Sequence, residues 1–377
     1  MKKMMKKILA IGIAALMLSM VVMSATAVND PSTLQDMDTY MISVDKVNIY
    51  TAWTLQYFVA TNITEFDKWE GATVGEPMLI YDTTGDPVLY DVPIVRNGDV
   101  VGAIGVWAKK NMGVPIYSLS SSPPELTTTK AEEIALKRAK EEEAEVGSVK
   151  VVYYDFPKRA VEVTLERDGK VIDKVLVDQA TNEAISEDKI KAFSSKVDKK
   201  KAQHALELWK EVDEQITTES KGEVSPLGIE QEILDVPLYG QETTYYCAPA
   251  SAQMILSYHG YQYTQSQIAE AMDTTVGGTL VWNIPTGIEE VTSNQVDSWN
   301  DWSWGWGTVT DEIDNNHPYM SNIVAGHSRA ARGYYYDTGR PWIKYQRIND
   351  PLPVGQGEER WENYYAVVEL CLTIVHP

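Results

Sequence analysis

The chain has 377 residues, of which 33 are basic and 54 are acidic, and its formal net charge is −21. That length is enough for two or three domains, each with its own hydrophobic core. So acidic a surface repels nucleic acid and anionic membranes, which makes peptides or neutral polymers the better candidates for partners.

The first 27 residues have the pattern of a secretory signal peptide. Four lysines within the first seven residues precede an apolar run over residues 8–23, and Ala25-Thr26-Ala27 matches an A-x-A cleavage site. The run is shorter than the roughly 20 residues that a membrane span needs, although an uncleaved anchor is the alternative. We therefore expect a mature chain that begins at Val28, is secreted or lies at the cell surface, and has no stable membrane span.

Residues 28–122 are expected to form a sheet-rich N-terminal module. The pattern predicts a short helix over residues 44–57, and Asn97-Gly98 is a strong two-residue hairpin turn. The strands expected in this module cover residues 78–81, 88–95 and 100–107.

A second module is expected over residues 123–187, after a loop or linker rich in Ser and Pro at residues 118–124. Thr129 and Glu132 have the spacing of a capping box, and the helix that they begin is predicted to continue to about Val146. Strands are expected over residues 149–154, 160–166 and 170–177.

Residues 188–229 are highly charged, which predicts a solvated helical linker. A segment that is cleaved during activation is the alternative. Gly222 to Pro226 would end the helix, and we expect the final domain to cover residues 230–377.

The chain contains only two cysteines, so it has no disulfide framework. Cys247 falls at the expected start of a helix, where unpaired N–H groups and a partial positive charge favour a thiolate. Cys371 lies in an apolar, β-branched segment that predicts a terminal strand, in which the thiol would be a packing residue. An ordinary buried cysteine, or a disulfide between Cys247 and Cys371, is the alternative.

A thiolate nucleophile needs a base, and histidine is the usual one. His327 is the strongest candidate, because it follows an apolar strand over residues 318–326 and begins the next strand. A satisfied core histidine is the alternative at this position. The other four histidines are weaker: His204 lies in the charged segment, His376 is next to the terminus and expected to be solvated, His259 ends the Cys247 helix, and His317 lies in a turn.

Two strands after His327 are expected to pair in antiparallel fashion. They cover residues 328–336 and 342–348, with a turn at Asp337-Thr338-Gly339 between them. Asp350 then falls near His327, where a carboxylate could orient the ring and stabilise the imidazolium. Asn349 is an alternative orienter, because a shift of one residue along a strand moves a side chain to the other face.

Four residues occur in order within three short motifs. Gln241 and Cys247 lie in V-P-L-Y-G-Q-x5-C-A-P-A-S, His327 ends P-Y-M-S-N-I-V-A-G-H, and Asp350 lies in I-N-D-P. Together these motifs resemble the papain-like cysteine peptidases related to the double-glycine leader peptidases of bacteriocin exporters. The resemblance covers residues 230–377. Two features differ from the pattern: Ala248 stands where many relatives have glycine or tryptophan, and no transporter follows, which leaves the substrate open.

The resemblance implies an α+β fold, in which a helix that bears the nucleophile packs on an antiparallel sheet. It also implies that Cys247 is the nucleophile, His327 the general base and acid, Asp350 its orienter and Gln241 the side-chain oxyanion donor. Residues 175–185, V-L-V-D-Q-A-T-N-E-A-I, resemble the PepSY-type modules of secreted peptidase propeptides. The N-terminal region would then be a regulatory or folding-assisting propeptide.

We therefore expect a secreted cysteine peptidase that hydrolyses peptide bonds in a peptide or protein substrate. An amidase or transpeptidase that acts on envelope polymer is one alternative, and a non-catalytic surface protein for adhesion or peptide binding is another. The tryptophans of residues 299–306 are expected to pack a loop onto the domain. Because no Cys/His cluster has metal-ligand spacing and no glycine loop fits a phosphate, we expect neither a metal nor a cofactor.

Overall fold

The computed structural model describes residues 40–377 apart from residues 62, 124–126, 191–198, 221, 223 and 366–368. The expected signal peptide, residues 1–27, lies outside this part. Residues Met41–Pro377 form one compact unit, within which the expected domain boundaries stay predictions. Over the described residues, no helix has both the length and the apolar character that a membrane crossing requires.

The N-terminal segment forms the expected helix and hairpin. Asn97 and Gly98 have φ values of 57° and 93°, as a two-residue hairpin turn requires, and they join β3 to β4. Residues 118–120, expected in a linker, instead end a strand that pairs with the C-terminal part of the chain. The elements are α3 (Val44–Val59), η1 (Thr64–Trp69), β1 (Thr73–Val74), β2 (Met78–Asp82), β3 (Pro87–Arg96), β4 (Asp99–Trp107), η2 (Lys110–Met112) and β5 (Ile116–Ser120).

The next segment forms one helix on a three-stranded meander, as expected. Its helix is shorter than predicted: Thr128 occupies the N-cap position, and the backbone at Glu143 has a φ of 52° before the first strand begins. The helix therefore ends before Val146, which lies in a strand. The elements are α4 (Thr129–Glu141), β6 (Glu145–Asp155), β7 (Lys158–Arg167), β8 (Lys170–Asp178) and η3 (Glu187–Lys189).

The charged helix α5 (Lys199–Glu219) is not solvated on every side, contrary to expectation. Trp209, Val212 and Ile216 recur at helical spacing and are buried in the same core as α3. The indole N–H of Trp209 donates to the hydroxyl of Tyr50 at 3.3 Å. One face of α5 is thus part of the N-terminal core.

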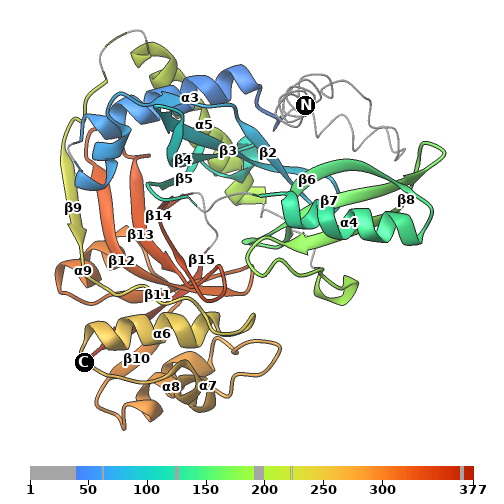
Figure 1. Ribbon diagram of the computed structural model, residues 1–377. Coiled ribbons are helices and arrows are strands. Elements are labelled where there is room, and N and C mark those ends of the chain that lie inside the picture. The colour runs from blue at the N-terminus through green and yellow to red at the C-terminus, as the bar shows by residue number, and fades with distance from the viewer. Residues whose placement is uncertain are drawn as a thin grey trace. The chain divides into compact units, whose positions relative to one another are not determined.

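The C-terminal segment places a helical group on an antiparallel sheet. Helix α6 lies along β11 and β12, with α7 and α8 beside it (Figure 1). The elements are β9 (Ile229–Ile233), α6 (Cys247–Tyr258), α7 (Gln265–Ala271), α8 (Asn283–Val291), β10 (Asp297–Asp301), α9 (Trp306–Asp314), β11 (Tyr319–Ile323), β12 (His327–Asp337), β13 (Lys344–Asp350), β14 (Glu358–Asn363) and β15 (Glu369–His376).

The strands join into one sheet with the order β10-β15-β11-β12-β13-β14-β5-β4-β3-β2-β6-β7-β8. Strands β14 and β5 connect the two halves, with Trp361 opposite Leu119 and Glu362 opposite Ser118. Successive side chains of a strand face opposite sides, so β12 contributes to two cores. Its Tyr335 packs with α3 and α5, whereas its neighbour Tyr334 packs in the core that contains α6.

Candidate active site

Cys247 is the first residue of α6, as predicted. The N–H of Ala250 donates to the carbonyl of Tyr246 at 2.9 Å, and Pro249 has no N–H. The amides of Cys247 and Ala248 therefore have no acceptor within the helix. These free donors and the positive end of the helix dipole lie beside the thiol, where they favour negative charge.

The imidazole of His327 lies between Cys247 and Asp350. It hydrogen-bonds the thiol of Cys247, and its Nε2 is 2.7 Å from Oδ1 of Asp350. Pairing of β12 with β13 brings the start of one strand to the end of the other, with Ala330 opposite Asn349. Asn349 turns away and donates its amide to the carbonyl of Val236, so Asp350 is the residue that contacts the ring.

Cys247, His327 and Asp350 shift one another's pKa values. Burial lowers the pKa of His327, but the negative charge of Asp350 and its hydrogen bond outweigh burial and raise it to about 9. Burial raises the pKa of Cys247, but the hydrogen bond and charge of His327 bring it below the ordinary value. The pKa of Asp350 is also lowered despite its burial, by the positive charges of His327 and Arg360. The group is thus arranged as a thiolate beside an imidazolium.

A buried guanidinium completes the surroundings of Asp350. Arg360 donates from Nη2 to Oδ2 of Asp350 at 2.6 Å and from Nε to Oε1 of Glu362 at 2.6 Å. Glu362 also pairs with Arg329, which in turn donates to Oε1 of Glu369 at 3.0 Å. Burial raises the pKa of Glu369 to about 7.

The sequence motifs did not predict this chain of alternating charges. Its local signal is the run E-E-R-W-E-N of β14, in which Glu358, Arg360 and Glu362 recur every second residue. Such a period places three charged side chains on one face of a strand. A charged face that is buried needs partners, and here Asp350 and Arg329 supply them.

Gln241 is buried in the loop before α6 and bonds within that loop. Its Nε2 donates to the carbonyl of Thr243 at 2.6 Å, while its Oε1 is buried without a hydrogen-bond partner. The main chain of Gln241 is tied to the loop after Asp350, because its N–H donates to the carbonyl of Pro351 and its carbonyl accepts from Gly355. The structure thus fixes Gln241 beside the end of β13.

Gln265 on α7 holds the same loop from the other side. Its Nε2 donates to the carbonyl of Gly240, and its Oε1 accepts from the N–H of Glu242, both at 2.9 Å. Gly240 itself is packed against the backbone of Gln356: a Cβ there would lie 2.2 Å from that residue's nitrogen. Only glycine allows this approach.

A pocket lies between the β6–β8 meander and the loops around Asp350. The start of β7 contributes Lys158, whose Nζ donates to the carbonyl of Thr244 at 3.4 Å, three residues before Cys247. The positive charge of Lys158 also contributes to the lowered pKa of Cys247. The meander is therefore part of the surroundings of the thiol. The pocket is lined by Tyr154, Pro157, Lys158, Arg159, Asp178, Gln179, Ala180, Thr181, Thr244, Asp350, Leu352, Pro353, Val354 and Glu358.

The remaining candidate residues lie elsewhere. Cys371 is buried in β15, where burial raises its pKa to about 11, and both cysteines are free thiols rather than a disulfide. His317 and His376 contact one another, so His376 is not simply solvated as expected. Trp304 and Trp306 pack against the core beside α6, whereas Trp302 is exposed and stacks on a second exposed tryptophan.

Comparison with known proteins finds one family that is similar to the C-terminal segment. Residues 233–369 match the model described as "Peptidase_C39 like family", which is just over a third of the chain. This match identifies these residues as a cysteine peptidase domain and confirms the expected α+β, papain-like fold. No curated protein matches the chain.

Three solved structures are each similar to a part of the chain. The peptidase domain of Streptococcus ComA, a bifunctional ABC transporter involved in quorum sensing, is 16% identical with a TM-score of 0.30, over 37% of this chain and 97% of that one. A double-glycine-motif protease from an AMS/PCAT transporter is 15% identical with a TM-score of 0.28, over 39% and 94%. A C39-like peptidase from Bacillus anthracis is 14% identical with a TM-score of 0.31, over 39% and 98%.

The coupled shifts of Cys247 and His327 predict how thiol alkylation depends on pH. Iodoacetamide reacts with the thiolate, so a lowered pKa moves the rise in rate to a pH below that of an ordinary thiol. His327→Ala removes the hydrogen bond and the charge that lower the Cys247 pKa, and burial, which raises it, remains. We expect labelling at pH 7 to slow by about tenfold for each pKa unit regained.

Mass spectrometry after timed alkylation measures the rate at each thiol. Cys371 is an internal reference, because its raised pKa keeps it slow. The matched control is His204→Ala, which removes an exposed histidine of α5. An unchanged pH profile in His327→Ala would contradict the ion pair.

Proposed function

We propose that this chain hydrolyses peptide bonds by nucleophilic attack of Cys247. The observation that carries the proposal is the bonded series Cys247, His327 and Asp350 at the start of α6, within the segment that matches a peptidase family. The Cys247 thiolate would add to the substrate carbonyl, and His327 would protonate the leaving amine to give a thioester. His327 would then take a proton from the water that attacks the thioester. This step releases the carboxylic acid product and restores the Cys247 thiolate and the His327 imidazolium. Asp350 would stay ionised and orient the ring.

The oxyanion that would form in both steps needs hydrogen-bond donors to stabilise it. The unpaired amides at the start of α6 lie beside the sulfur, and Gln241 is proposed as the side-chain donor. Its Nε2 carries two hydrogens, of which one is used on Thr243. The second hydrogen remains for the oxyanion, while the bond to Thr243 keeps the amide oriented. We propose that substrate approaches through the pocket next to Asp350.

Turnover of a peptide substrate tests these roles. Cys247→Ala should abolish cleavage, whereas Gln241→Ala should lower kcat by about 100- to 1,000-fold through the lost oxyanion donor. Alkylation of Cys247 needs no oxyanion donor, so its rate should change little in Gln241→Ala. The measurement is cleavage of a peptide library by the chain from Val28, followed by mass spectrometry.

Gln203→Ala, on the exposed face of α5, is the matched control for loss of a glutamine and should keep full activity. Equal activity in Gln241→Ala and Gln203→Ala would contradict the oxyanion role. Intact peptides after incubation with a chain whose Cys247 alkylates rapidly would contradict peptidase activity, and cleavage of amide bonds in envelope polymer would indicate the amidase alternative.

We also propose that the N-terminal region, which includes the PepSY-like residues 123–187, acts as a propeptide that assists folding of the peptidase domain. Trp342, Tyr345 and Trp361 of the C-terminal segment are buried in the core that α3 and α5 complete. The indole of Trp361 donates to Glu65 at 3.0 Å, and Tyr117 donates to Glu362 at 3.2 Å. These contacts support dependence of the peptidase domain on the N-terminal region.

Residues 230–377 expressed alone should therefore lack a cooperative unfolding transition, because three large aromatic side chains would no longer be buried against α3 and α5 and would be exposed to water. Urea unfolding followed by tryptophan fluorescence compares this fragment with the chain from Val28. A fragment that unfolds cooperatively and cleaves peptide as fast as the longer chain would rule out the folding role. A folded fragment with higher activity would indicate that the N-terminal region restrains the enzyme instead.

The proposed site of action is outside the cytoplasm. The support is the basic, apolar and A-x-A pattern of residues 1–27. Expression of the full chain in a secreting host should yield a protein in the exported fraction that begins at Val28, as intact-mass measurement would show. A retained chain that still begins at Met1 would contradict export.

A further inference from the structure

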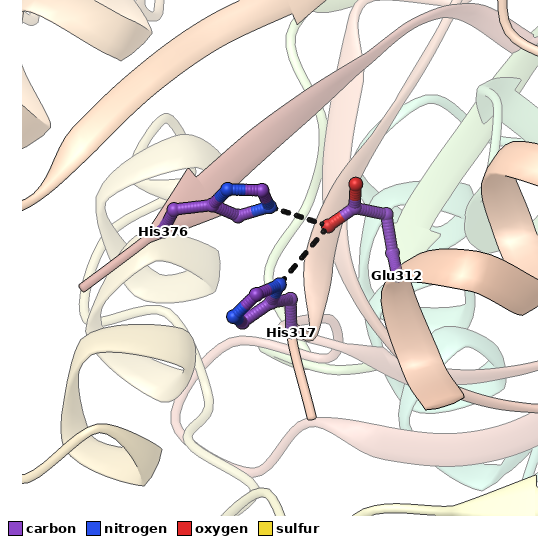
Figure 2. A group of neighbouring side chains, drawn as sticks. All are labelled: Glu312, His317 and His376. Carbon is purple, nitrogen blue, oxygen red and sulfur yellow. Dashed lines mark hydrogen bonds and ion pairs between the residues drawn. The ribbon is translucent and has the colours of Figure 1, made fainter. Parts of the chain in front are cut away.

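Two histidines and a glutamate outside the proposed catalytic site converge on one point. Glu312 lies in the last turns of α9, His317 follows that helix, and His376 ends β15. Oε2 of Glu312 is 2.8 Å from Nε2 of His376 and 3.6 Å from Nδ1 of His317. Figure 2 shows the two rings directed at the same carboxylate oxygen.

Packing holds the three side chains in this arrangement. The N–H of His317 donates to the carbonyl of Glu312 at 2.8 Å, which fixes the chain where it leaves α9. The rings of His317 and His376 lie 4.0 Å apart, and Trp299 packs edge-on against His376 at 4.9 Å. Strand β15 is itself paired with β10 up to His376. The donors are therefore positioned by three different elements.

A third imidazole lies beside this group. His259 follows the last residue of α6, its ring centre is 6.3 Å from that of His317, and its Nε2 is buried without a hydrogen-bond partner. His259 therefore adds a further imidazole nitrogen next to the three converging side chains.

We propose that Glu312, His317 and His376 bind one divalent transition-metal ion, with zinc the best match. Their donor atoms all lie within 4.8 Å of one another. In a tetrahedral zinc site with bonds of about 2.0–2.1 Å, neighbouring donors are about 3.3 Å apart, and the contacts of 2.8 and 3.6 Å lie on either side of that value. Two nitrogens and one oxygen suit zinc better than calcium or magnesium, which prefer oxygen ligands. Three protein ligands leave one position for water.

Sequence spacing predicted no metal, because the three ligands do not form a compact motif. The site is distinct from the thiol: His259, beside the cluster, and Cys247 lie at opposite ends of α6, about 18 Å apart at 1.5 Å per residue. A bound ion would join α9, the turn before β11 and the end of β15. It would therefore stabilise the fold, with no direct contact to Cys247.

Metal titration of the chain from Val28 tests the proposal. The chain carries Cys247→Ala, so that no thiol beside His327 can bind zinc, and it has no polyhistidine tag. After treatment with a chelator, we expect calorimetry to give one equivalent of bound Zn²⁺, Co²⁺ to give the visible absorption of a tetrahedral site, and zinc to raise the Tm. Glu312→Gln and His376→Ala should each weaken binding by more than about tenfold.

The matched control is His204→Ala, which should bind zinc with unchanged affinity. Circular dichroism of each variant without metal checks that the fold is retained, and His317→Ala provides a further variant if one of the others fails to fold. The proposal is overturned if Zn²⁺ does not bind at millimolar concentration, or if it binds equally well to folded Glu312→Gln and His376→Ala.

Discussion

The buried carboxylate of Asp350 determines which partners the site needs and how its other groups are protonated. A charge with 0% exposure is costly unless both oxygens find partners, and here Oδ1 accepts from His327 and from the N–H of Leu352 while Oδ2 accepts from Arg360. Loss of one partner in such a pair leaves an uncompensated buried charge, which costs about 3–5 kcal/mol. The same pairing raises the pKa of His327, and through it the thiol of Cys247 loses its proton more readily.

The charge chain also links the proposed chemistry to the N-terminal half. Glu362 of β14 contacts Arg360 on one side and accepts from Tyr117 of β5 on the other, at the point where β14 and β5 join the two halves of the sheet. Trp361, between Arg360 and Glu362, faces the aromatic core that α3 and α5 complete. Successive residues of one strand therefore connect to the proposed catalytic residues and to the core, so electrostatics and folding depend on the same pairing.

Local patterns in the sequence were sufficient to predict the parts of the site that depend on residues close together in the chain. The helix at Cys247 follows from apolar spacing and Pro249, and the approach of Asp350 to His327 follows from two strands with one turn between them. The charge chain, the buried face of α5 and the Glu312 cluster depend instead on which distant segments pair. The pairing of β14 with β5 joins segments that are far apart in the chain, and the hydrophobic periodicity of each strand does not specify its partner. The alternating charges of β14 were the one local signal of it, because a charged face in an apolar sheet requires partners.

The contact between Gly240 and Gln356 limits how such a site can diversify. A Cβ on residue 240 would lie 2.2 Å from the nitrogen of Gln356, so even alanine would separate the loop that carries Gln241 from the loop that follows Asp350. Residue 240 must therefore stay glycine if the two loops are to keep their positions, whatever the substrate. Gln179, Ala180 and Thr181 form a part of the pocket wall that follows β8, outside the loops that carry Gln241 and Asp350. In the proposed route of substrate approach, new substrate preferences would arise there, in a segment far from Cys247 in the sequence, while the proposed reacting groups stay unchanged.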